Sequence, residues 1–216
     1  MNNKSMKLKV ALILCLSSSL SYSQIVINSD VANAVSDLSV VTLKSGALAP
    51  TTAVVDFFWF SSSDSATISG WNSASDWTSS SLYSNLLGNL LMGDGYGNAG
   101  LFSGPVLPGP VSASTVGKFI GVAITSGSEL GVFRGSELVP NNTPAPSPET
   151  PVNFYLPDVN SDGVMVGSFS VLSTVELFGS TFENVEAYAL IPEPYSASLL
   201  ALGVAGLVAL RVRRKS

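Results

Sequence analysis

The sequence predicts a mainly β protein: an antiparallel sandwich or barrel-like exported domain with one short helix, followed by a C-terminal transmembrane helix. Two observations lead to this prediction. In the middle of the chain, short β-branched or aromatic runs are separated by Gly, Ser, Asn and Pro, and this spacing favours antiparallel sheets over alternating β-α units. Near the C-terminus, an uncharged apolar run extends from Tyr195 to Leu210.

The β-branched and aromatic runs define the expected strands. They are Ile25–Ile27, Ser39–Leu43, Ala53–Phe60, Lys118–Thr125, Glu129–Arg134, Val152–Leu156, Val164–Leu172, Thr174–Phe178 and Val185–Leu190. The run Ala53–Phe60 is almost continuously apolar, which indicates a central strand covered on both faces. Two proline-rich stretches, 105–110 and 140–151, are expected to be loops within one domain.

One helix is expected from Leu82 to Met92. The five leucines of this segment fall on one face at helical spacing, and the serines of Ser79–Ser81 offer an N-cap. Gly88 would weaken such a helix by about 1 kcal/mol relative to alanine. The glycine-rich segment Gly93–Asn98 would then end it in a loop.

Residues 1–23 have the organisation of a secretory signal peptide. Three lysines precede the apolar stretch Val10–Leu16, which is too short to span a membrane. The small residues Ser21 and Ser23 place the expected cleavage before Gln24. The chain therefore divides into a signal peptide (1–23), a β-rich exported domain (24–190) and a C-terminal segment (191–216).

The exported domain is acidic and contains no cysteine. Cys15 is the only cysteine of the chain and would leave with the signal peptide, so no disulfide is expected. Between Gln24 and Ile191 there are three basic and fourteen acidic residues, a formal net charge of −11. Such a surface repels nucleic acid and other anionic polymers, so no nucleic-acid partner is expected.

The C-terminal segment combines a short proline motif, an apolar run and a basic end. The motif is Pro192-Glu193-Pro194, and the basic residues are Arg211, Arg213, Arg214 and Lys215. As a helix, the run Tyr195–Leu210 would span roughly 24 Å, close to the ~30 Å hydrocarbon core. Lys and Arg next to a span resist translocation, so the basic end is expected on the cytoplasmic side. The alternative is a buried C-terminal helix of a soluble domain.

The three parts of this segment resemble the PEP-CTERM sorting signal, and the resemblance is limited to residues 191–215. In that family, the tripeptide, the helix and the basic end direct an exported protein to an exosortase. This membrane enzyme occurs in Gram-negative bacteria that make extracellular polysaccharide. The resemblance implies that Pro192, Glu193 and Pro194 are recognised and that the tail is cleaved near them. It carries no information about residues 24–190.

The residue types present restrict the chemistry of the exported domain. The chain has no histidine, which excludes Ser-His-Asp triads and His-ligated zinc or iron. Glycosidase chemistry needs only two carboxylates, so a secreted hydrolase stays as a third hypothesis, but no motif selects a pair. We therefore expect a protein without catalytic residues.

The best local candidate for a ligand site is the segment from Asp158 to Gly163. Asp158, Asn160 and Asp162 stand at alternate positions before a glycine, like the first half of a calcium-binding loop. Phe169 occupies the twelfth position, where such a loop has a carboxylate. The competing interpretation is a turn between two strands. We expect no cofactor, with calcium as the alternative.

The tryptophans bear on carbohydrate binding, since flat aromatic rings stack on sugars. Trp59 lies in a run that looks buried, whereas Trp71 and Trp77 lie in Ser- and Asn-rich sequence and could be exposed. Packing in the core or under a loop is the expected use of all three. A carbohydrate-binding surface module that uses Trp71 or Trp77 is the alternative.

Together these observations predict an exported structural or adhesive protein of the cell surface or extracellular matrix. It would cross the inner membrane, be held by its C-terminal helix as a single-pass anchor, and be processed by an exosortase-type membrane enzyme. Extracellular polysaccharide is the expected environment and a candidate partner.

Overall fold

The computed structural model describes residues 24–31, 38–106, 113–140, 149–159 and 161–192. Within them the chain is mainly β, as the sequence predicts. The strands are β1 (Gln24–Asp30), β2 (Ser39–Thr42), β3 (Val54–Phe60), β4 (Leu86–Leu91), β5 (Ser103–Val106), β6 (Phe119–Ser126), β7 (Glu129–Leu138), β8 (Glu149–Tyr155), β9 (Val164–Val166), β10 (Ser168–Leu177) and β11 (Ser180–Ala189). The α-helices are α2 (Ser65–Ser69) and α3 (Ala74–Ser79), and short 3-10 turns flank them.

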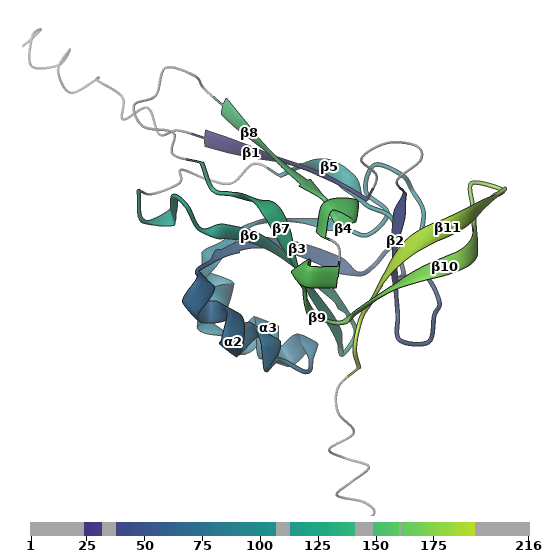
Figure 1. Ribbon diagram of the computed structural model, residues 1–216, viewed down its shortest axis with the longest axis horizontal. Helices are drawn as coiled ribbons and strands as arrows, with labels where there is room; N and C mark the ends of the chain where they lie inside the picture. Colours follow the sequence, from purple (N-terminus) through teal and green to yellow (C-terminus); the bar gives the residue numbers. More distant parts are fainter. Residues whose placement is uncertain (1–23, 32–37, 107–112, 141–148, 160, 193–216) are drawn as a thin grey trace, which may run out of the picture.

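The strands form one five-stranded sheet and two three-stranded sheets (Figure 1). The larger sheet has the order β4-β3-β6-β7-β9 and is antiparallel throughout. The smaller sheets have the orders β5-β1-β8 and β10-β11-β2. In each of them one pair is parallel, β1 with β8 and β2 with β11. A parallel pair cannot be closed by a tight hairpin, so these pairs join segments far apart in the chain.

Strand β3 lies inside the large sheet and is covered on both faces, which confirms the prediction for this run. Val55 and Phe57 point into one hydrophobic cluster, while Phe58 and Phe60 point into another. All four side chains are fully buried. Because successive side chains of a strand point to opposite faces, a run that is apolar at almost every position needs a layer on each side.

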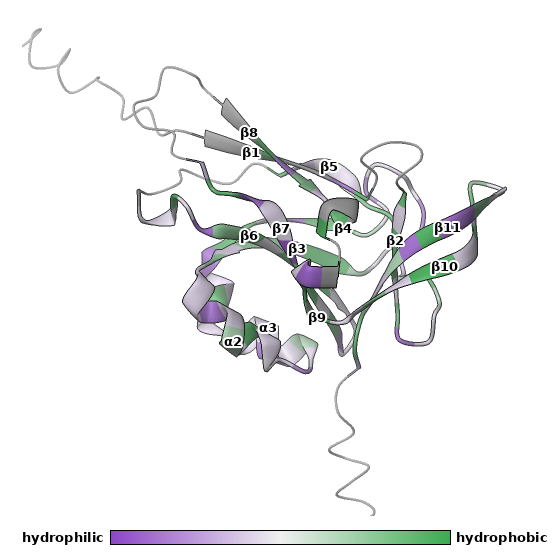
Figure 2. Cartoon of the chain, in the orientation of Figure 1, coloured by the Kyte–Doolittle hydropathy of each residue, from purple (hydrophilic) through white to green (hydrophobic). Residues whose placement is uncertain are grey.

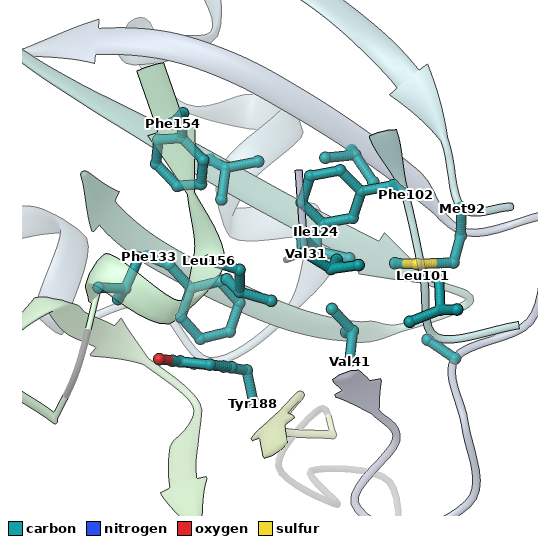
Figure 3. Packing of buried hydrophobic residues seen from close by; sticks show 14 of the residues in the cluster. Val31, Val41, Met92, Leu101, Phe102, Ile124, Phe133, Phe154, Leu156 and Tyr188 are labelled. Atoms are coloured by element: carbon teal, nitrogen blue, oxygen red, sulfur yellow. The ribbon is translucent and has the colours of Figure 1, made fainter. Parts of the chain in front are cut away.

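The first cluster lies between the five-stranded sheet and the two smaller sheets (Figure 3). Aromatic rings make its contacts across the layers. The ring centroids of Phe57 and Phe154 are 5.5 Å apart, and those of Phe133 and Tyr188 are 5.4 Å apart, both edge to face. Such pairs add about 0.5–1.5 kcal/mol to the free energy of burial. Strands β8 and β11 are thereby attached to the large sheet by side chains.

The second cluster lies under helices α2 and α3, on the other face of the five-stranded sheet (Figure 1). Ile68 and Trp77 pack there on the β3 side chains Phe58 and Phe60. Ser73 begins α3 as its N-cap and accepts a hydrogen bond from the backbone N–H of Asp76. Figure 2 shows that the helices carry mostly hydrophilic residues elsewhere. These helices are too short to be stable alone, so their packing on the sheet stabilises them.

The predicted helix from Leu82 to Met92 is wrong. The α-helices of the structure, α2 and α3, lie earlier in the chain, within residues 65–79. A 3-10 turn occupies Ser81–Asn85, and Leu86–Leu91 is strand β4, which pairs with β3. A Cβ built on Gly88 would lie 2.5 Å from Cγ1 of Val106. The leucines fit a helix locally, but pairing with β3 satisfies their backbone groups and overrides that preference.

Strand β5 was not expected, because its segment contains Pro105. It pairs only with β1 and lies at the edge of its sheet. Proline lacks a backbone N–H, and within sheets it is therefore confined to edge strands and bulges. Pro151 in β8 occupies the other edge of the same sheet. Both prolines therefore mark edge strands of one sheet.

Candidate functional site

The predicted sorting motif directly follows two residues that pair with the rest of the domain. The N–H of Leu190 donates to the carbonyl of Thr42 at 2.9 Å. Ile191 and Leu130 exchange two backbone hydrogen bonds, of 2.8 and 2.9 Å. Leu190 is buried, and Ile191 packs against the cluster under the helices. Pro192 follows, and it has no backbone N–H to donate.

Two turns surround this junction. Gly127 and Ser128 connect β6 to β7, and the segment from Leu43 to Ala47 closes with a backbone hydrogen bond of 2.8 Å. The N–H of Lys44 donates to a carboxylate oxygen of Glu129 at 3.1 Å, which joins the two turns. We call the segments 43–47 and 127–129, together with Ile191, the junction end of the domain.

Most of the predicted sorting and anchoring residues lie outside the described residues. Pro192 is half-buried and is the last residue that the structure describes. Glu193, Pro194, the run Tyr195–Leu210 and the basic residues Arg211, Arg213, Arg214 and Lys215 all follow it. In the described part of the chain, no helix has the length and apolar character needed to cross a membrane.

Of the three calcium candidates, the structure describes only the side chain of Asp162. Asp162 is exposed, and Asn160 lies outside the described residues. Gly163 is buried where a Cβ would lie 2.8 Å from the carbonyl oxygen of Arg134, so close packing accounts for this glycine. Among the described residues, no group of three or more His, Cys, Asp or Glu side chains could hold a metal ion.

The competing interpretation, a turn between two strands, agrees with the structure, and the two strands belong to different sheets. Strand β8 precedes the segment and pairs with β1, whereas β9 follows it and pairs with β7. The segment is therefore a crossover between two sheets, built from 3-10 turns at Leu156–Val159 and Ser161–Gly163. Local turn residues predict a change of direction, but they do not determine which strands pair.

Trp71 and Trp77 do not form an exposed platform, which contradicts the alternative of a sugar-binding surface at these two residues. Trp71 is 8% exposed and Trp77 is fully buried, with their ring centroids 5.7 Å apart. The indole N–H of Trp77 donates to Oδ2 of Asp56 at 2.8 Å. Ser75 and Ser79 lie on the exposed side of α3, while Ser73 is buried as its N-cap, so polar neighbours in sequence did not indicate exposure. Their packing role confirms the expected use, and Trp59 is half-buried against the first cluster.

Asp56 is a carboxylate in an apolar environment. It belongs to β3, is only 4% exposed and lies on the face that the helices cover. Burial raises its pKa, and the hydrogen bond from Trp77 opposes this rise to a smaller extent. The arrangement attaches helix α3 to the sheet through one specific polar contact.

An exposed aromatic residue, Phe178, occurs at the tip of the β10–β11 hairpin, beside the partly buried Tyr96. Phe178 and Gly179 form the two-residue turn, with φ angles of 55° and 73°. Positive φ is unfavourable for a bulky residue such as Phe178, and its side chain is 55% exposed. Its ring centroid lies 6.1 Å from that of Tyr96. Backbone strain at an exposed aromatic residue is a reason to look for a ligand there.

A hydrogen bond to Asp30 fixes the position of the Tyr96 hydroxyl. This hydroxyl donates to Oδ1 of Asp30 at 2.7 Å, and the hydroxyl of Ser103 donates to Oδ2 of Asp30 at 3.0 Å. Burial and the neighbouring carboxylate raise the pKa of Tyr96, so its phenol stays protonated. Any two of Tyr96, Phe178 and Asp30 are at least 66 residues apart in the sequence. Sequence reasoning therefore missed that they lie together. The Phe178-Gly179 pair between two strand-like runs was the only local signal.

Comparisons of the chain with known protein families, with curated proteins and with solved structures found no match.

Proposed function

We propose that this protein is exported through the inner membrane, held by a single C-terminal span, and processed at Pro192-Glu193-Pro194 by an exosortase-type membrane enzyme. After processing it serves as a structural or adhesive protein of the cell surface or the extracellular matrix. The observation that carries the proposal is the order of three parts in the tail: motif, apolar run Tyr195–Leu210, and basic end Arg211–Lys215.

The position of the motif next to the folded domain supports this proposal. The backbone hydrogen bonds of Leu190 and Ile191 attach the chain after β11 to Thr42 and Leu130, directly before Pro192. Cleavage at the motif would therefore leave these contacts of the domain in place.

The composition of the domain supports a role outside the cell without catalysis. Its formal net charge of −11 favours solubility. The same charge repels anionic polymers, unless cations bridge the two. The absence of histidine excludes the commonest hydrolytic sites. A layered β-sandwich is also a common scaffold for surface proteins.

The processing step is tested by replacing the central residue of the motif. Glu193→Ala should leave membrane insertion unchanged, since the apolar run drives insertion, but it should block conversion to the released form. Glu183→Ala, an exposed carboxylate on β11, is the matched control. Pulse-chase labelling with cell fractionation follows both variants. If the Glu193→Ala variant is processed and released at the wild-type rate, the tail is a plain anchor and the proposal fails.

A second candidate function is carbohydrate binding at Phe178 and Tyr96. The observation that favours it is Phe178, which has a positive backbone φ angle and a half-exposed side chain. It lies beside Tyr96, whose hydroxyl is hydrogen-bonded to Asp30. An aromatic face can stack on the apolar face of a neutral sugar. The acidic surface of the domain disfavours an anionic ligand. This would place the extracellular polysaccharide contact at the hairpin tip.

Glycan-array binding of the released protein tests this candidate. Phe178→Asn should abolish binding without harming the fold, because asparagine tolerates positive φ better than phenylalanine. Val171→Asn, at an exposed apolar position on the same hairpin, should bind as the wild type does. Equal binding by the wild type and the Phe178→Asn variant would eliminate this site.

A further inference from the structure

We infer that, before processing, the junction end of the domain contacts the outer surface of the inner membrane. The tip of the β10–β11 hairpin is then directed away from the membrane. This inference rests on the proposed function for the insertion of Tyr195–Leu210. The contact surface consists of the segments 43–47 and 127–129 beside Ile191. The partner is the headgroup layer of the lipid bilayer.

The first argument is the length of chain between the domain and the apolar run. Ile191 is paired with Leu130, and only Pro192, Glu193 and Pro194 separate it from Tyr195. Four residue steps span at most about 14 Å even when fully extended. A domain of this size is roughly 40 Å across. The connection is therefore too short for the domain to turn its far side toward the bilayer.

The second argument is that this connection resists lengthening. Peeling the chain back would break the hydrogen bonds between Ile191 and Leu130 and between Leu190 and Thr42. It would also expose Leu190, which is 1% exposed. A Cβ on Gly131 would lie 2.6 Å from Cδ2 of Leu190, so Leu190 fills a space that a glycine leaves free. The folded strand thus holds the origin of the tail at the junction end.

The third argument is the charge and size of the residues at this end. The two turns carry one cation, Lys44, and one carboxylate, Glu129, which accepts a hydrogen bond from the Lys44 backbone N–H. The rest of the two turns consists of small residues and Leu43. An anionic headgroup layer repels the acidic domain as a whole, and it repels a nearly neutral end least. This surface suits contact with headgroups and does not require insertion into the hydrocarbon core.

The orientation has a consequence for the opposite end of β11. This strand runs from Ser180 at the hairpin turn to Ala189, next to the junction (Figure 1). At about 3.3 Å per residue, its ten residues separate the tip from the junction by roughly 30 Å. Phe178 and Tyr96 would then face away from the membrane, toward the cell exterior, while the protein is still anchored.

Single cysteines test the orientation, because the chain after the signal peptide has no cysteine of its own. Ser128→Cys places a thiol in the β6–β7 turn, and Ser180→Cys places one at the hairpin tip; both serines are exposed. Each is labelled with a fluorophore in the chain from Gln24 to Ser216, which lacks Cys15, with Glu193→Ala added to prevent processing. The chain is reconstituted in phosphatidylethanolamine and phosphatidylglycerol vesicles that contain a headgroup spin label. We expect loss of fluorescence at position 128 and none at position 180.

Two further measurements separate the possible causes. A long Gly/Ser spacer between Ile191 and Pro192 should relieve quenching at position 128, since the short connection causes it. Equal quenching at both positions or stronger quenching at position 180 overturns the inference; quenching at position 128 that persists with the spacer supports the headgroup contact and assigns it to the two turns. Flotation of the vesicles reports on the proposed function separately. A chain that does not float with them overturns the membrane anchor, and this orientation with it.

Discussion

Asp56 is the residue at which burial and charge conflict most directly. Its carboxylate lies under helix α3 and accepts a hydrogen bond from the indole N–H of Trp77, and burial raises its pKa above the usual 3.8. The folded state therefore binds a proton more tightly than the unfolded state does. The stabilisation that comes from this proton is complete below pH 3.8 and is lost as the pH rises through the raised pKa.

Asp56→Asn should increase the free energy of unfolding at pH 7. The amide keeps an oxygen that accepts the Trp77 hydrogen bond, and it removes the cost of burying a charge. The advantage over the wild type should shrink as the pH falls toward 3.8. Urea unfolding at pH 7 and at pH 4 measures the difference in stability between the variant and the wild type. Glu183→Gln, at an exposed position of β11, is the control. A loss of stability at pH 7 would show that the charged form is favoured at this position.

At the scale of single elements, strand β4 shows how tertiary contacts override local preference. Its segment has leucines at helical spacing, yet it pairs with β3 and places Gly88 against Val106. The two interpretations predict opposite effects of one substitution. In a helix, alanine would be better than glycine by about 1 kcal/mol. In the observed strand, an added methyl group meets Val106.

Gly88→Ala should therefore destabilise the protein, by about 1–3 kcal/mol, as overpacking generally does. The cost should be smaller in a Val106→Ala background, where the valine methyl groups are gone. Chemical denaturation of the two single variants and the double variant measures this coupling. Additive effects, or a gain in stability from Gly88→Ala alone, would contradict the contact between β4 and β5.

At the scale of the whole molecule, the core is joined directly to the predicted tail. Leu190 and Ile191 contribute backbone hydrogen bonds and buried contacts next to the motif. Only Pro192, Glu193 and Pro194 separate Ile191 from the apolar run, and this short stretch limits the orientation of the domain at the membrane.

A fragment of residues 24–189 should be less stable than one of residues 24–191 by about 2 kcal/mol or more, because burial of one leucine is worth roughly that much. A fragment of residues 24–194 should match 24–191, since Pro192 adds no pairing. Urea unfolding of the three fragments provides the comparison. Equal stability of 24–189 and 24–191 would mean that the contacts of Leu190 and Ile191 do not stabilise the domain.

The sequence by itself determined the mainly β class, most of the strands and the prediction of the sorting tail. These features depend on local patterns: an apolar run such as Ala53–Phe60 has to be covered on both faces, and an uncharged apolar run before a basic end is recognisable wherever it stands. Only the tertiary structure decided that β1 pairs with β8 and β2 with β11, that Leu86–Leu91 is a strand, and that Trp77 is buried while Phe178 is exposed. The physical reason is that each of these depends on contacts between residues distant in sequence. Local composition carries no record of such partners.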